Sequence, residues 1–583
     1  MSRFFKSALA KTALAAGGVA GASVVYLDFV KQPNQREFNN SYKPLLTTLE
    51  TPPTREDLLK KLKTTDKFDV LVIGGGATGT GTALDAATRG LNVCLLEKGD
   101  FASGTSSKST KMAHGGVRYL EKAIFQLSKD QLDLVIEALN ERGNMLRTAP
   151  HLCSVLPIMI PVYKWWQVPY FFVGCKMYDW FAGHQNLRNS TIFSKETTAS
   201  IAPMMDHSNL KASCVYHDGT FNDSRMNSTL AITAISHGAT VLNYMEVKQL
   251  IKEDGKVVGV LARNRETGEE SLVRATATVN ATGPMADRLL EMDADPQGLP
   301  PKIPQAPRMV VPSSGVHVVL PEYYGPQTMG LLDPSTSDGR VMFFLPWQGK
   351  EATGTQGLVR SHLLTQSESG LVTISGGKWT TYREMAQETV DHVVKNFDFG
   401  NRQVGPCRTN ELILIGGEDY SKNYSARLIH KYKIPLKLAK YLSHNYGSRS
   451  SLILELYQES DFNKLPVTLA ASKSFEPSTE KTTDDNFLSY QSFDEPFTVA
   501  ELKYSLKYEY IRTPLDFLAR RSRLAFLNAR QALHAVDGVV EIMKNELNWD
   551  DETSERLAEE ARKYIGQMGI SSEKFNVTDF IVQ

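Results

Sequence analysis

The sequence predicts an α/β protein that opens with a Rossmann-type dinucleotide-binding domain, continues with mixed α and β structure, and ends in an all-α domain. The opening domain is predicted by the order of strand, glycine-rich turn, helix and strand between Asp69 and Asp100. A long amphipathic helical stretch from about Val117 to Leu146, and strand-like segments with turn signals over 240–270, indicate the mixed middle. After about Pro406 the apolar residues recur with a helical period.

Length and composition favour a globular protein of two or three domains. The 583 residues are 42% hydrophobic and 22% charged, which excludes disordered and collagen-like classes. Because 65 basic residues balance 65 acidic ones, no global field attracts nucleic acid, and we predict no nucleic-acid partner. The five cysteines have no Cys-x-x-Cys spacing, so we predict no iron–sulfur or zinc site: Cys94, Cys153, Cys175, Cys214 and Cys407.

The N-terminal segment is typical of a mitochondrial presequence. Arg3, Lys6 and Lys11 carry positive charge and no acid precedes Asp28, while a weakly apolar, uncharged run follows to Leu27. That run is shorter than the roughly 20 residues of a membrane-spanning helix. We therefore predict residues 1–31 as a mitochondrial targeting and apolar anchor segment, with a secretory signal as the alternative.

The remaining chain divides into three predicted parts. Residues 32–66 are polar and proline-bearing and form a linker, in which Thr54 and Asp57 predict a capping box at the start of a short helix. Residues 67–405 form the cofactor and substrate domain. Residues 406–583 form the helical domain, with a polar insert near 477–486. No Asp-x-Asp-x-Asp-Gly loop occurs, so an EF-hand is not supported.

The first chemical motif is Gly74-x-Gly76-x-x-Gly79, which lies between an apolar strand and a helix. Its glycines allow a tight turn and a close approach of a pyrophosphate to the helix N-terminus. Glu97 ends the second strand, near the roughly 20-residue spacing at which an acid accepts ribose hydroxyls. This context favours a cofactor over an empty glycine turn. The predicted contacts are Gly74, Gly76, Ala77, Thr78, Gly79, Glu97 and Lys98.

Three further segments favour FAD over NAD as the cofactor. Gly104–Lys111 is a dense run of hydroxyls and lysines, which suits a pyrophosphate and the edges of a flavin. Thr278–Pro284 is a strand that closes into a turn of small residues. Gly376–Arg383 precedes a helix, whose positive end would stabilise anionic reduced flavin. These segments add Thr105, Ser106, Ser109, Thr110, Gly283, Gly377 and Thr380 to the predicted FAD contacts.

Six segments together resemble the FAD-linked glycerol-3-phosphate dehydrogenases: DVLVIGGGATGTGTALDAATRG, FASGTSSKSTKMAHGGVRYLE, YHDGTFNDSRMN, VNATGP, TSDGRVMFFLPW and GGKWTTYR. The resemblance covers most of the chain from Asp69 onward and, without EF-hands, is to the fungal mitochondrial type. It implies an amino-acid-oxidase-like fold, with the FAD domain interleaved with a mixed-sheet substrate domain. It also implies oxidation of sn-glycerol 3-phosphate to dihydroxyacetone phosphate, with electrons passed to ubiquinone.

The resemblance also implies the substrate residues. His114, Arg118 and Tyr119 match the motif placed over the flavin, and Arg118 would hold the phosphate or polarise the forming ketone. His317 would be the catalytic base, and Lys378 a second phosphate contact. From the pattern alone, Arg118 is equally a solvated charge at a helix start, and His317 a packed histidine in an apolar strand.

One stretch of the family pattern is absent. After Lys350 the family continues with an Ala-Gly-Thr-Thr-Asp strand, helices and a Trp-x-Gly-x-Arg-Pro-Leu motif whose arginine contacts phosphate. Here EATGTQGLVRSH follows and no Gly-x-Arg-Pro occurs, which predicts an internal shortening near 350–355 and an unpaired sheet edge. The alternatives are an impaired flavin-binding isoform or gene-model truncation, and an amino-acid oxidase of the same fold.

The segment from Tyr163 to Phe181 is crowded with aromatic residues. Such crowding is expected for a belt at a membrane interface or for a quinone entrance, and equally for a buried aromatic core. Since the quinone acceptor lies in the inner mitochondrial membrane, we predict attachment there, with a homodimer as the suggested assembly.

Overall fold

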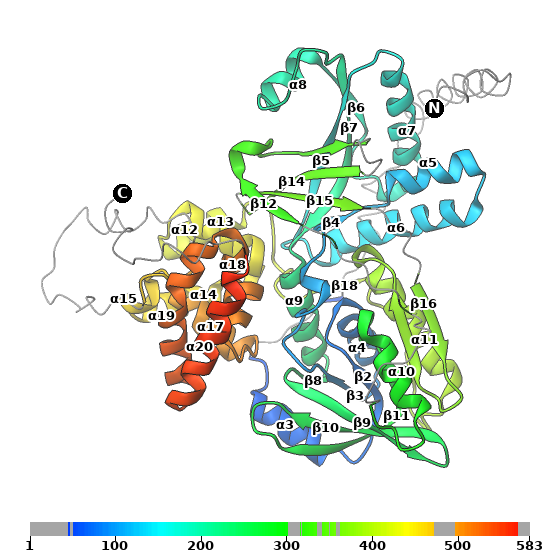
Figure 1. Ribbon diagram of the computed structural model, residues 1–583, viewed down its shortest axis with the longest axis vertical. Coiled ribbons are helices and arrows are strands. Elements are labelled where there is room, and N and C mark those ends of the chain that lie inside the picture. Colours follow the sequence, from blue (N-terminus) through cyan, green and yellow to red (C-terminus); the bar gives the residue numbers. More distant parts are fainter. Residues whose placement is uncertain are drawn as a thin grey trace, which may run out of the picture.

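The computed structural model describes residues 45–46, 51–300, 310, 315, 317–334, 341–348, 350–356, 362–470 and 496–568. The predicted targeting segment 1–31 and the polar insert near 477–486 lie outside these residues. Figure 1 shows three parts: a lower sheet with helices on its faces, an upper sheet, and a helical domain beside their junction.

The lower sheet has the order β16-β17-β11-β2-β3-β8. Its centre is parallel, and every residue of β2 (Phe68–Ile73) and β3 (Val93–Leu96) is buried. Burial on both faces is expected of a parallel sheet that helices cover on each side. The other strands are β8 (Thr240–Leu242), β9 (Met245–Glu253), β10 (Lys256–Asn264), β11 (Glu270–Asn280), β16 (His362–Gln366) and β17 (Val372–Gly376).

The helices of this part confirm the predicted order of elements. α4 (Ala77–Thr88) follows the glycine turn, and α11 (Tyr382–Asn396) follows the Gly376–Arg383 segment. In α3 (Arg55–Thr64) the predicted capping box is present: Asp57 N donates to Thr54 Oγ1 at 3.1 Å and Thr54 N to Asp57 Oδ2 at 3.0 Å. The remaining helices are α9 (Asp223–Ser236) and α10 (Ala286–Ala294).

The upper sheet has the order β12-β15-β14-β13-β5-β7-β4, with β6 also paired to β7. The chain passes from β15 directly to β16 of the lower sheet, so the two sheets are interleaved in sequence, as predicted. The strands are β4 (Met112–Ala113), β5 (Cys153–Val162), β6 (Thr191–Ser194), β7 (Ala212–Phe221), β12 (Val318–Pro321), β13 (Gly330–Asp333), β14 (Val341–Trp347) and β15 (Lys350–Gln356).

The shortened region does not leave β15 as an edge. β15 pairs with β14 on one side and with β12 on the other, and the sheet ends at the four-residue strand β12. The predicted unpaired edge therefore falls at β12 instead of at the point where the family pattern breaks.

The predicted single helical stretch from Val117 to Leu146 is two helices. α5 (Val117–Gln126) ends at Leu127, whose φ of 50° is left-handed and stops an α-helix. α6 (Lys129–Thr148) begins at Ser128, whose side chain accepts a hydrogen bond from Gln131 N. The spacing of the apolar residues continues through this turn, and for this reason the sequence pattern predicted one helix instead of two.

In the described residues of the C-terminal part, helices predominate and the one strand is β18 (Leu412–Ile413), which pairs with β1 (Leu45–Leu46). Its core also takes in Trp347 of β14, which ties the helices to the upper sheet. The helices are α12 (Tyr424–Tyr432), α13 (Leu436–Tyr446), α14 (Ser450–Glu459), α15 (Asp461–Lys464), α17 (Val499–Tyr508), α18 (Leu524–Leu527), α19 (Ala529–Leu547) and α20 (Asp551–Gly566). Among the described residues, no helix is both long and apolar enough to cross a membrane.

Candidate functional site

The glycine turn after β2 has no room for side chains. Gly74 has a φ of +113°, and a Cβ there would lie 2.6 Å from the carbonyl oxygen of Ala281 at the end of β11. A Cβ on Gly79 would lie 1.9 Å from the carbonyl oxygen of Gly74. The first turn of α4 therefore packs directly on the strand ends, an arrangement in which a helix N-terminus can accept a pyrophosphate.

Glu97 is held at the rim of this turn. Its Oε2 accepts from Gly75 N at 2.7 Å and its Oε1 from Gly99 N at 2.8 Å. Burial raises the pKa of the Glu97 carboxyl, and the two backbone hydrogen bonds oppose that rise. Each carboxylate oxygen keeps a further lone pair, which suits the ribose hydroxyls of an adenosine. Lys98, in contrast, is exposed.

The other predicted cofactor segments meet the glycine turn. Ser106 Oγ accepts from Ala77 N at 3.0 Å, and Ser106 O accepts from Trp379 Nε1 at 2.9 Å. Thr380 Oγ1 accepts from His114 N at 3.3 Å. Residues far apart in the sequence thus surround one place at the carboxyl ends of the parallel strands, and they fit a bound FAD.

Ser109 differs from its neighbours in the cofactor loop. Its backbone N and its Oγ both donate to Asp223 Oδ2, at 2.9 and 2.8 Å. The hydroxyl predicted to contact FAD is therefore already bound to the protein. Among the remaining predicted contacts, Gly283 and Gly377 have positive φ values of 58° and 73°, which favour glycine at both positions.

Three of the predicted substrate residues lie close together. Lys378 Nζ lies 4.0 Å from the ring centre of Tyr119, and His114 is buried beside Thr380. Arg118 lies in the first turn of α5, and its side chain is outside the described part of the chain. The structure therefore brings Lys378, Tyr119 and His114 to the same end of the cofactor site.

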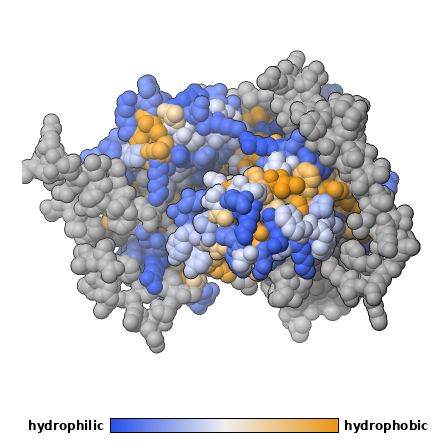
Figure 2. All heavy atoms as spheres, turned by 90° about the horizontal axis from the view of Figure 1, so that it is seen from above, coloured by the Kyte–Doolittle hydropathy of each residue, from blue (hydrophilic) through white to orange (hydrophobic). Residues whose placement is uncertain are grey.

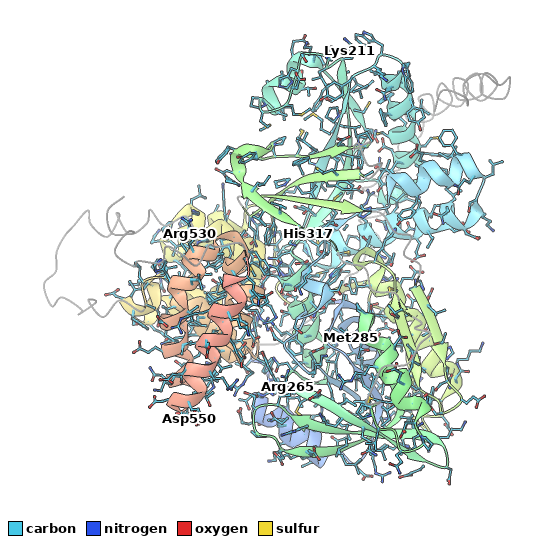
Figure 3. All side chains as sticks on the ribbon, in the orientation of Figure 1. Lys211, Arg265, Met285, His317, Arg530 and Asp550 are labelled. Carbon is cyan, nitrogen blue, oxygen red and sulfur yellow. The ribbon has the colours of Figure 1, made fainter. Side chains whose placement is uncertain are left out.

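His317 is separate from the group of Lys378, Tyr119 and His114. It immediately precedes β12 and is exposed, so the interpretation as a packed core histidine is wrong. Figure 3 places it where the two sheets and the helical domain meet. Its pKa is lowered, first by partial desolvation and then by the charge of Lys111, while Asp223 opposes the shift. A lowered pKa leaves the imidazole neutral near pH 7, the form that accepts a proton.

Lys111 and Asp223 act on His317 and, with Arg523, form a buried charged cluster. Sequence reasoning counted Lys111 among the possible cofactor donors and gave Asp223 and Arg523 no role. Asp223 Oδ2 is 3.6 Å from Lys111 Nζ, and Asp223 Oδ1 is 3.8 Å from Arg523 Nη2. The ring of Trp347 lies 4.7 Å from Lys111 Nζ and 5.3 Å from Arg523 Cζ. Lys111 and Asp223 lie inside motifs that were recognised, but Arg523 comes from the C-terminal domain and only the tertiary structure reveals its position.

One face of the upper part carries exposed aromatic and aliphatic side chains. They lie at the end of α5 and on α7 (Gln167–Ala182) with the turn before it, and Figure 2 shows hydrophobic residues gathered at this end of the molecule. Since α7 also buries Cys175, Tyr178 and Ala182, the segment is part core and part exposed face. The exposed side chains are Phe125 (66%), Leu127 (91%), Trp165 (68%), Trp166 (53%) and Trp180 (57%).

Comparison with known proteins agrees with this geometry. The FAD dependent oxidoreductase family matches residues 69–398, and the C-terminal domain of alpha-glycerophosphate oxidase matches residues 407–554. Proteins named "Glycerol-3-phosphate dehydrogenase, mitochondrial" are 63% identical in Schizosaccharomyces pombe, over all of both chains, and 39% identical in Homo sapiens, over 99% of this chain and 84% of that one. The crystal structure of the glycerol-3-phosphate dehydrogenase from Bacillus halodurans complexed with FAD has a TM-score of 0.65 at 25% identity and covers 90% of this chain and 99% of that one.

The alignment with the Schizosaccharomyces pombe protein spans 651 positions, 68 more than the 583 residues of this chain. This chain therefore has gaps at 68 positions or more, in line with the predicted internal shortening, whose place near Lys350 stays a prediction. Because the relatives carry the dehydrogenase name, the comparisons do not favour the alternative of an impaired flavin-binding isoform.

Proposed function

Because this chain belongs to the FAD-dependent mitochondrial glycerol-3-phosphate dehydrogenases, we propose that it oxidises sn-glycerol 3-phosphate to dihydroxyacetone phosphate and passes the electrons to ubiquinone at the inner membrane. The FAD cofactor and the mitochondrial location follow from the family. The observation that carries the proposal is the 63% identity to a named mitochondrial dehydrogenase along the entire chain.

FAD, when bound, supplies the acceptor for the hydride that leaves C2 of the substrate. The glycine turn and the N-terminus of α4 would hold its pyrophosphate, and Glu97 the adenosine ribose. The N-terminus of α11, after Gly377 and Thr380, would face the flavin ring with its positive end. These assignments are supported by the hydrogen bonds that join the cofactor segments to each other.

His317 is the proposed base. As the C2–H bond gives up its hydride, the C2 hydroxyl loses its proton to the neutral imidazole, so the products are the ketone and a protonated His317. The lowered pKa of His317 supports this role, because it keeps the ring unprotonated when the substrate arrives.

The substrate phosphate needs cations close to it. Lys378 stands over the ring of Tyr119, and Arg118 directly precedes Tyr119 in the same motif as His114. We assign phosphate binding to Lys378, with Tyr119 and His114 lining the site and Arg118 binding phosphate or polarising the forming ketone.

The exposed face of α5 and α7 is the proposed membrane contact. Trp165, Trp166 and Trp180 combine an apolar ring with an N–H donor, as residues at a bilayer interface do. Exposed apolar patches mark interaction sites more often than free surfaces. Ubiquinone would reach the protein from the same side, because it is dissolved in the bilayer. The homodimer remains a prediction that light scattering tests.

An anaerobic titration tests the proposed reaction. The purified protein with bound FAD is mixed with glycerol 3-phosphate, and the flavin absorbance should bleach; a soluble ubiquinone analogue should then restore it. Persistent yellow colour, under conditions in which the Schizosaccharomyces pombe relative bleaches, would reject the activity of this chain. Bleaching without recovery on addition of the quinone would reject ubiquinone as the acceptor.

A further inference from the structure

The C-terminal domain contacts the loop Gly104–Lys111, which carries the predicted cofactor hydroxyls. Arg523 Nη2 donates to the carbonyl oxygen of Ser107 at 2.8 Å, across 416 positions of sequence. On its other face the same loop meets the cofactor motifs, through Ser106 Oγ to Ala77 N and Ser106 O to Trp379 Nε1. Adjacent residues of one loop thus connect the C-terminal domain to the cofactor site.

Asp223 completes this arrangement. It accepts both donors of Ser109, lies 3.6 Å from Lys111 and is 3.8 Å from Arg523. Arg523 therefore holds the loop directly at Ser107. Asp223, which pairs with Arg523, holds it at Ser109 and Lys111. Because Asp223 is fully buried, its charge depends on these two cations for compensation.

Two backbone conformations at this place are unfavourable by themselves. Lys111 and Arg523 have φ values of 59° and 66°, in the left-handed region that residues with side chains rarely adopt. Both side chains end at Asp223 and over the ring of Trp347. Strain of this kind is retained where a particular geometry is needed, so it points to function more than to general stability.

The guanidinium of Arg523 is also incompletely satisfied. Its Nε and Nη1 are buried and have no acceptor among the residues that the structure describes. A contact selected for stability alone would not leave two buried donors open. We interpret Arg523 as a cation that is kept for its position beside the Gly104–Lys111 loop, at the expense of its own hydrogen bonds.

We propose that Arg523 is a positioning residue of the FAD site: through Ser107 and Asp223 it holds the Gly104–Lys111 loop in the conformation that retains the cofactor. The C-terminal domain is then a part of the cofactor site and not only a cap. The proposal rests on the FAD dependence of the family but not on the substrate or the quinone.

The test compares two variants that each weaken buried charge contacts at the junction of the domains. Arg523→Met removes the link to the cofactor loop. Glu509→Gln weakens the ion pairs of Glu509 with Arg225 and Arg521, whose partners all lie outside that loop. For each variant, the dissociation constant and release rate of FAD are measured by flavin fluorescence without substrate, together with the melting temperature of the apoprotein.

We expect Arg523→Met to raise the FAD dissociation constant by about tenfold or more, the ratio that one charge-assisted hydrogen bond gives. Glu509→Gln should lower the melting temperature and change the dissociation constant less than about threefold, and Arg523→Lys should recover part of the lost affinity. Unchanged FAD affinity in Arg523→Met, or an equal loss in both variants, would overturn the proposal. If Arg523→Met is insoluble, Arg523→Lys decides: wild-type FAD affinity and release rate would overturn the proposal, and faster release at an unchanged melting temperature would support it.

Glycerol 3-phosphate provides an independent readout. If Arg523 only positions the cofactor, Arg523→Met saturated with FAD should keep its KM for glycerol 3-phosphate within about twofold while kcat falls. A raised KM at full FAD occupancy would assign Arg523 to the substrate instead, and would contradict a positioning role. Failure of the proposed oxidation would leave the FAD measurements unaffected, so the two proposals fail separately.

Discussion

Arg225 of α9 and Glu509, just after α17, form a bidentate pair across the junction of the cofactor domain and the C-terminal domain, at 2.7 and 2.6 Å. Both side chains are buried, and the Arg225 guanidinium also lies 4.0 Å from the ring centre of Tyr446. The pair lowers the pKa of Glu509 against the effect of burial. The two domains are therefore joined by charge as well as by apolar packing.

Breaking this pair should be costly. Arg225→Met leaves the Glu509 carboxylate buried with Arg521 and Arg449 as remaining cations, and we expect a loss of about 3–5 kcal/mol in the free energy of unfolding. Urea denaturation measures the change. Arg530→Met, an exposed arginine on α19, is the matched control and should change stability by less than about 0.5 kcal/mol. Equal stability of the two variants would contradict a buried charge contact.

The glycine turn should not tolerate a methyl group. Gly79→Ala places a Cβ 1.9 Å from the Gly74 carbonyl oxygen, so the turn must move and FAD binding should be lost. Gly174→Ala is the control, since a Cβ at that position would have nothing within 4 Å. The ratio of flavin absorbance to protein absorbance after purification reports the outcome. A yellow Gly79→Ala protein would show that this turn does not hold the cofactor.

The pH dependence of flavin reduction should reflect His317. Its pKa in the folded protein is lowered from 6.5, so the unprotonated base persists into mildly acidic solution. The rate constant for bleaching by glycerol 3-phosphate should rise with pH through a pKa below 6.5. His317→Asn should abolish this rising limb of the pH profile. The limb is measured by stopped flow on the FAD-loaded protein. Its survival in His317→Asn would assign the base to another residue.

His151 should make the protein sensitive to acid. It is fully buried, and burial lowers its pKa to about 3, with the charge of Arg225 as a second cause. Protonation therefore favours the unfolded chain, so the contribution of His151 is complete above the unfolded pKa of about 6.5 and is lost as pH falls below it. Down to pH 4 the unfolding free energy should fall by about 1.4 kcal/mol per pH unit from this group. His151→Gln should lessen that slope, and an unchanged slope would contradict the assignment.

The exposed tryptophans should control binding to lipid. Trp165→Ser combined with Trp166→Ser should weaken binding to phosphatidylcholine vesicles by about tenfold or more, because each exposed indole contributes a kcal/mol or more of apolar transfer. Leu272→Ser, an exposed residue of β11 in the other sheet, is the control. Vesicle co-sedimentation gives the affinities. A similarly small loss of vesicle affinity in the tryptophan variant and in Leu272→Ser would contradict a membrane contact at α7 and the turn before it.

Much of the backbone geometry at the candidate cofactor site could be predicted because its chemistry is local. The glycine spacing around Gly76, the position of Glu97 and the helix start after Gly377 each lie within a few residues, and the backbone geometry they demand is the one found. The break between α5 and α6 was missed because the left-handed turn at Leu127 does not interrupt the apolar period. His317 was placed in a strand that begins one residue later.

The sequence by itself determined the family, the cofactor and the order of strands and helices around it, since each depends on short motifs whose side chains act on their own backbone. Only the tertiary structure decided that Arg523 reaches Ser107 and that His317 has Lys111 and Asp223 as its charged neighbours. These contacts join residues separated by about a hundred to four hundred positions, and no spacing rule links them. Their energies come from burial and charge, which exist only after the three parts have packed together.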